Sequence, residues 1–163
     1  MTTQTISPSP AAINFWRWVF PITYLIHIAE EYWGGEGYPA YILRLRGVHM
    51  TTTRFLLAQG IGVVLVTIGV ILARRFKFPR MMLIILGAIV LVNGITHTVT
   101  ALSIMSYGPG LWSSIFVWMP LGIYTLWRFK KGMSGKQYWV GIAIGIGVNI
   151  VVGILTMRGG RLV

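Results

Sequence analysis

The chain has only three carboxylates, and two of them follow a histidine at helical spacing. In the segment His27-Ile28-Ala29-Glu30-Glu31, the glutamates stand three and four residues after His27. Residues three and four apart share one face of a helix, so these side chains are expected to lie together. Because an ionisable group inside a membrane span costs about 2.5–3.5 kcal/mol, such a cluster in an apolar segment indicates a functional site.

A second polar pair of the same kind occurs later in the chain. Asn93 and His97 are four residues apart within an apolar stretch, and they therefore share a helix face. Imidazole and carboxylate groups together suit zinc, iron or manganese, and they can also act as general acids and bases. Since the chain has no cysteine, any bound metal must be held by nitrogen and oxygen atoms.

The composition indicates which elements must position these residues. Hydrophobic residues make up 55% of the chain and charged residues 10%, against about 25% charged residues in soluble domains. Five stretches approach the roughly 20 apolar residues that a helix needs to cross a bilayer; they are residues 15–33, 55–73, 81–104, 111–129 and 138–157. The sequence thus predicts an all-α integral membrane protein, a compact bundle of five transmembrane helices. Residues 15–163 would form one domain, and residues 1–14 a disordered lead.

The basic residues indicate how this bundle is oriented. Nine of the fourteen Lys and Arg residues would lie on the same side of the membrane as the N-terminus. This excess favours a cytoplasmic N-terminus and an external C-terminus. The basic residues are spread over span ends, so nucleic-acid binding is not expected. The first and third spans run in the same direction. Their C-terminal halves, which carry the two polar groups, would lie in the outer leaflet, where residues 106–110 also emerge.

Three short motifs occur in order along the chain. They are HIAEE at residues 27–31, NGITH at residues 93–97 and YGPG at residues 107–110. In these motifs the chain resembles the HXXEE family of small integral membrane proteins, and the resemblance extends from residue 15 to the last predicted span. The resemblance implies an enzymatic site formed by the three motifs and adds Tyr107 to the candidate residues. It implies no particular reaction.

One function that fits these residues is a metal-assisted hydrolase of a lipid-like or amphipathic substrate. The two histidines and one glutamate would hold zinc, or else iron or manganese, and the other glutamate would act as general base. A nearby amide or phenol would orient the substrate or stabilise the developing oxyanion. The predicted metal ligands are His27, Glu30 and His97. The predicted catalytic residues are Glu30, Glu31, Asn93 and Tyr107.

Two other functions remain open. Without a metal, a protonated glutamate in an apolar cavity could donate a proton to an olefin, epoxide or carbonyl, as in a cyclase or isomerase of an apolar substrate. Alternatively, the polar groups could form a proton or ion relay, or belong to an accessory membrane subunit. The five predicted spans show no pair of inverted repeats, which disfavours a transporter.

The polar residues also have purely structural explanations. The glutamates could face the headgroups where the first span leaves the membrane. Asn93, His97 and Gln59 could join helices through hydrogen bonds worth about 0.6 kcal/mol each. Glu36 and His49 are expected to be solvated loop residues outside the site, in a segment that could form a short interfacial cover.

The last predicted span carries a stripe of small residues. Gly141, Gly145 and Gly153 recur on one helix face, which predicts that another helix approaches closely, either inside the bundle or in a homodimer. The other expected partners are membrane lipids and an apolar or amphipathic small-molecule substrate.

Overall fold

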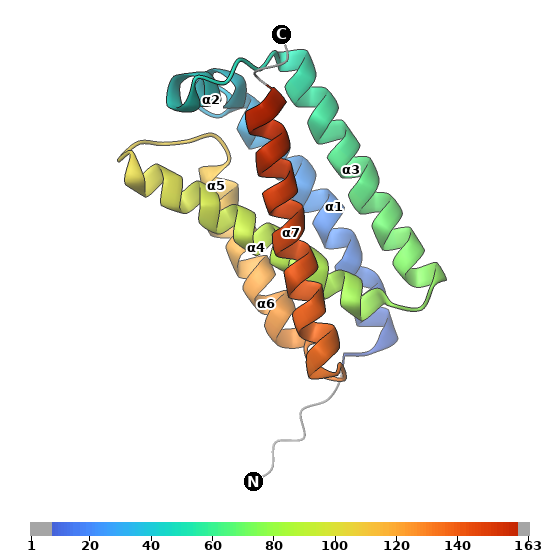
Figure 1. Cartoon of the computed structure of the whole chain (residues 1–163). Helices are drawn as coiled ribbons and strands as arrows, with labels where there is room; N and C mark the ends of the chain where they lie inside the picture. The colour runs from blue at the N-terminus through green and yellow to red at the C-terminus, as the bar shows by residue number, and fades with distance from the viewer. Residues whose placement is uncertain (1–7, 160–163) are drawn as a thin grey trace.

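Helices form nearly all of residues 8–159, which are the residues described by the computed structural model (Figure 1). No strand occurs within this range. The elements, in chain order, are α1 (Pro10–Trp33), α2 (Tyr38–Arg46), α3 (Thr52–Arg75), α4 (Pro79–Ser103), α5 (Leu111–Ser113), the π-helical turn η1 (Ser114–Trp118), α6 (Met119–Phe129) and α7 (Gly135–Gly159). The expected all-α fold is therefore confirmed.

Each of the five apolar stretches is helical. Four of them coincide with α1, α3, α4 and α7, and the fifth, residues 111–129, is formed by α5, η1 and α6 in direct succession. Successive long segments run in opposite directions, with α4 crossing the others obliquely (Figure 1). Among the residues that the structure describes, three helices, α3, α4 and α7, are long and apolar enough to cross a membrane.

Helix α1 begins earlier than the sequence predicts. Ser9 is its N-cap and accepts a hydrogen bond from the backbone N–H of Ala12, and Pro10 occupies the first helical turn. Both residues favour helix initiation at these positions. Ile13 is buried in the core, so residues 10–14 belong to the bundle rather than to a disordered lead. Residues 1–7 lie outside the described part of the chain.

Helix α4 is the centre of the bundle and packs mainly against α6 and α7. Small residues allow this close approach. A Cβ atom at Gly122 of α6 would lie 2.7 Å from the Cβ atom of Leu91, and one at Gly145 of α7 would lie 2.6 Å from that of Ala88. Gly141 and Gly145 thus pack inside the chain against α4, while Gly153 has open space around its Cβ position.

A valine in place of Gly145 is expected to destabilise the bundle, because its side chain would overlap α4. Overpacking of this kind costs about 1–3 kcal/mol. Gly153→Val is the matched control, since it makes the same chemical change on the same helix where nothing lies within 4 Å. Thermal unfolding in detergent, followed by circular dichroism, should show a lower Tm for Gly145→Val only. Equal shifts for both variants would contradict this packing.

Candidate metal centre

Two residues of α1 and one residue of α4 converge on a single point. The Oε1 atom of Glu31 lies 3.6 Å from Nε2 of His27 and 3.5 Å from Nε2 of His97. One potential ligand atom from each residue lies within 4.8 Å of the other two. The side chains of His27 and Glu31 are almost fully buried, with exposed fractions of 1% and 4%. The first and second motifs therefore meet, as the direction of the helices predicted.

His27 is oriented by a serine that follows the third motif. Its Nδ1 atom lies 2.7 Å from the Oγ atom of Ser113, whose hydroxyl donates to the carbonyl of Gly110 at 3.3 Å. Ser113 therefore accepts a hydrogen bond from the Nδ1–H group, which leaves a lone pair on Nε2. This Nε2 atom is buried and has no hydrogen-bond partner. The ring also stacks on Trp118, with centroids 3.6 Å apart.

His97 is held by the same segment of the chain. It forms a hydrogen bond with the backbone of Pro109. Since proline has no backbone N–H, its carbonyl oxygen is the acceptor. The His97 ring stands edge-on to that of His27, at a centroid distance of 5.0 Å. Both histidines thus donate one ring N–H to residues 109–113, an arrangement typical of metal-binding histidines.

A glutamine of α3 holds the side chain of Glu31 in place. The amide of Gln59 donates to Oε2 of Glu31 at 2.5 Å, and the hydroxyl of Tyr24 donates to Oε1 of Gln59 at 2.8 Å. One carboxylate oxygen is therefore occupied, while the other faces the two histidines. The sequence predicts for Gln59 only a hydrogen bond between helices, and in the structure the partner in that bond is Glu31 of the cluster.

Glu30 has a different environment from Glu31. Its Oε1 atom accepts hydrogen bonds from the Tyr107 hydroxyl at 2.9 Å and from the backbone N–H of Trp112 at 2.8 Å. Its Oε2 atom accepts from the backbone N–H of Ser113 at 2.6 Å. These N–H groups lie in the first turn of α5, whose N-cap, Gly110, has no side chain to accept them. Glu30 thus caps another helix, and a negative charge at a helix N-terminus is favourable.

The sequence predicts Glu30 as the glutamate that would hold a metal, whereas the structure brings Glu31 close to both histidines. A helix turns by about 100° per residue, so residues three and four after His27 lie about 60° to one side of it and about 40° to the other. Spacing alone puts both glutamates on the His27 face. The neighbouring helices decide between them, because α4 and α3 face Glu31 and the start of α5 faces Glu30.

The hydroxyl of Tyr107 donates its hydrogen bond to the capping residue Glu30. Burial and the hydrogen bond to Glu30 raise the pKa of Tyr107 to about 12. The phenol therefore stays protonated at neutral pH and donates to the carboxylate. The predicted role of Tyr107 in stabilising an oxyanion would require this bond to break.

The remaining candidates lie outside the cluster. Asn93 is one turn before His97 on α4, and its Oδ1 atom is buried without a hydrogen-bond partner. Glu36 is bound to Arg44 at 2.6 Å in an exposed ion pair. His49 is an exposed loop residue.

The final glycine of the YGPG motif packs against all three cluster residues. Gly110 has φ = +86°, a conformation that favours glycine. A Cβ atom there would lie 2.8 Å from Cε1 of His27, 3.0 Å from Cε1 of His97 and 3.1 Å from Cγ of Glu31. The third motif is therefore part of the site through its backbone. The sequence does not predict Ser113 or Trp118 as site residues, although a serine pair stands three residues after the YGPG motif.

Replacing Glu30 with alanine is expected to destabilise the protein, because two N–H groups and one phenol would lose their acceptor. Hydrogen bonds to a charged group contribute about 1.5–3 kcal/mol each. Glu36→Ala is the matched control, since it removes a carboxylate from an exposed ion pair with Arg44, and such surface pairs contribute little to stability. The Tm should fall clearly in Glu30→Ala and little in Glu36→Ala. Similar Tm values for the two variants would argue against the cap.

The comparisons with known proteins agree with the three motifs. Neither a search of curated proteins nor a search of solved structures found a match. The family described as "Protein of unknown function with HXXEE motif" matches residues 18–125. This range contains the HIAEE, NGITH and YGPG segments and more than half of the chain. The chain therefore belongs to the HXXEE family.

Proposed function

We propose that this protein is a membrane-embedded, metal-dependent hydrolase of a lipid-like or amphipathic substrate. His27, Glu31 and His97 hold one divalent metal ion, with zinc favoured and iron or manganese as alternatives. The observation that carries the proposal is the convergence of three potential ligand atoms, two of which belong to almost fully buried side chains. Each of the three side chains also forms a hydrogen bond with a different partner residue. Two imidazoles and one carboxylate form a ligand set found at catalytic zinc sites.

The spacing of the three atoms favours a metal ion over a shared proton. A hydrogen bond between an imidazole and a carboxylate would bring nitrogen and oxygen to about 2.7–2.9 Å. The two distances to Oε1 of Glu31 are instead 3.5 Å and 3.6 Å. Ligands about 2.0–2.1 Å from a tetrahedral ion are about 3.3 Å apart. The two ring nitrogens are at most 4.8 Å apart, so binding would draw the rings closer together.

The proposed chemistry needs only three protein ligands. A divalent ion at such a site lowers the pKa of bound water to about 7 and polarises a carbonyl group. Hydrolysis of an ester then adds water to the carbonyl carbon and breaks the bond to the alcohol oxygen, which leaves as the alcohol after taking up a proton. Glu30 is a poor general base, since three donors already occupy its oxygens. Asn93, with its unpaired buried oxygen, remains a candidate for orienting the substrate.

The proposal includes a membrane orientation. Helix α1 and residues 111–129 would cross the bilayer together with α3, α4 and α7, giving five spans. The alternating directions of the five segments support this arrangement, as does the excess of basic residues at the end where α1 begins. The N-terminus would be cytoplasmic and the C-terminus external, with the His27–Glu31–His97 cluster in the outer leaflet.

Metal analysis of the purified protein tests the ligand set. The wild-type protein should contain about one zinc, iron or manganese ion per chain, and His27→Ala, His97→Ala and Glu31→Gln should each lose it, since three-ligand sites tolerate no missing ligand well. His49→Ala is the matched control, because His49 is the remaining histidine and lies exposed in a loop. A metal retained in His97→Ala, or equally reduced in His49→Ala, would refute this site.

A chelator distinguishes the hydrolase from a metal-free acid–base enzyme. Hydrolysis of a series of chromogenic esters should disappear after chelation and return when the metal is added back. Glu31→Gln should be inactive even with added metal. If ester hydrolysis survives chelation but is lost in Glu31→Gln, the glutamate acts as an acid or base without a metal, and the metal-dependent mechanism is refuted.

A further inference from the structure

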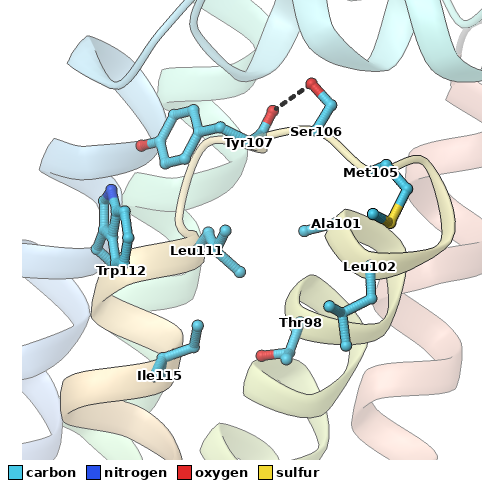
Figure 2. Close-up of a pocket in the computed structure, with 9 residues that line it drawn as sticks. All are labelled: Thr98, Ala101, Leu102, Met105, Ser106, Tyr107, Leu111, Trp112 and Ile115. Atoms are coloured by element: carbon cyan, nitrogen blue, oxygen red, sulfur yellow. Dashed lines mark hydrogen bonds between the residues drawn. The ribbon is translucent and has the colours of Figure 1, made fainter.

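An apolar groove lies between the C-terminal turns of α4 and the start of the α5–η1 segment (Figure 2). Its volume is about 370 Å³. Ala101 and Leu102 line it from α4, and Leu111 and Ile115 line it from the opposite side. None of its lining residues is charged.

The groove opens at the outside of the bundle and has one polar end. Leu102, Met105 and Trp112 line it and are 66%, 88% and 55% exposed. Ser106 and the backbone of Tyr107 form its end at the α4–α5 loop, where the Ser106 hydroxyl donates to the Tyr107 carbonyl at 3.5 Å (Figure 2). An occupant that matches these walls has a long uncharged apolar part and a small polar end.

Two chain segments contribute residues both to the groove and to the surroundings of the metal centre. Thr98 lines the groove and directly follows His97, and Leu111 lines it and directly follows Gly110, which packs against all three cluster residues. Tyr107 and Trp112 also line the groove, and both donate hydrogen bonds to Glu30. A ligand in the groove would therefore contact the same two chain segments that hold the histidines.

We propose that this groove binds the hydrocarbon chain of a neutral single-chain amphiphile from the outer leaflet, with its polar end at Ser106 and Tyr107. The proposal rests on the proposed hydrolase and membrane orientation, and it names the substrate class: long-chain esters or amides with one acyl chain. A volume of about 370 Å³ is near the lower end of the range of about 300–1,000 Å³ for small-molecule sites. This size suits one chain better than a two-chain phospholipid.

Quenching of tryptophan fluorescence by dibromostearyl alcohol tests the groove in the full-length, metal-loaded protein. Bromine quenches nearby indoles, and Trp112 lies in the groove wall. Quenching should saturate at one probe per chain. Ala101→Phe and Leu102→Phe, which would fill the groove, should weaken binding at least about tenfold, equivalent to about 1.4 kcal/mol. Val99→Phe is the matched control on α4, because Val99 is 54% exposed and does not line the groove.

Several outcomes would overturn the groove as a binding site. Quenching that never saturates, or that is matched by a brominated phosphatidylcholine, would indicate ordinary contact with membrane lipid. Equal affinity of Leu102→Phe and Val99→Phe for the brominated alcohol would exclude the groove. This comparison holds even if Ala101→Phe fails to fold, since Ala101 is only 7% exposed. A disulfide-linked dimer through cysteines introduced at Leu102 and Met105 would identify the groove as a contact between two copies instead.

Metal content measured on the same samples separates this inference from the proposed function. Saturable probe binding without a bound metal would support the groove and contradict the hydrolase. A bound metal without saturable probe binding would leave the metal centre in place and refute the groove. If esters are hydrolysed, Leu102→Phe should raise KM for long-chain esters, whereas Val99→Phe should not.

Discussion

The Glu30 carboxylate fixes the position of the segment on which the whole site depends. It accepts hydrogen bonds from two backbone N–H groups of α5 and from the hydroxyl of Tyr107. These bonds hold the start of α5 against the end of α1, and so place Pro109 beside His97 and Ser113 beside His27. A helix N-terminus that begins with glycine needs an acceptor from elsewhere in an apolar environment. In this chain, a glutamate on a different helix provides it.

The three sequence motifs then have distinct and complementary roles. The first contributes His27 and Glu31 to the cluster with His97, and it contributes the capping residue Glu30. The second contributes His97, and its Gly94 allows α4 to approach the π-helical turn, since a Cβ atom there would lie 3.3 Å from the Ser114 carbonyl. The third supplies the turn that leads into α5, which Glu30 caps, and its Pro109 and Gly110 lie against the cluster. Such π-turns are frequent at functional sites, and this one ends at Trp118, on which His27 stacks.

Much of the fold could be predicted from the sequence, because the length of an apolar stretch and the spacing of polar residues on a helix can both be read from neighbouring residues. The five helical segments and the meeting of His27 and Glu31 with His97 followed from these two properties. The separate roles of Glu30 and Glu31 could not be predicted, since both are compatible with the same helix face and only neighbouring helices distinguish them. The contribution of Gln59 depended on the approach of α3 to α1, and that of Ser113 on the conformation of the YGPG turn. Both are tertiary contacts that no spacing rule encodes.

The most direct test of the metal centre is X-ray absorption spectroscopy at the edge of the bound metal. The spectrum should show two imidazole rings and a carboxylate oxygen, with first-shell distances of about 2.0–2.1 Å. In His97→Ala, the imidazole contribution should fall to one ring or the metal should be absent, while His49→Ala should match the wild-type protein. A wild-type spectrum with a first shell of oxygen only, without scattering from imidazole, would contradict a site formed by His27, Glu31 and His97.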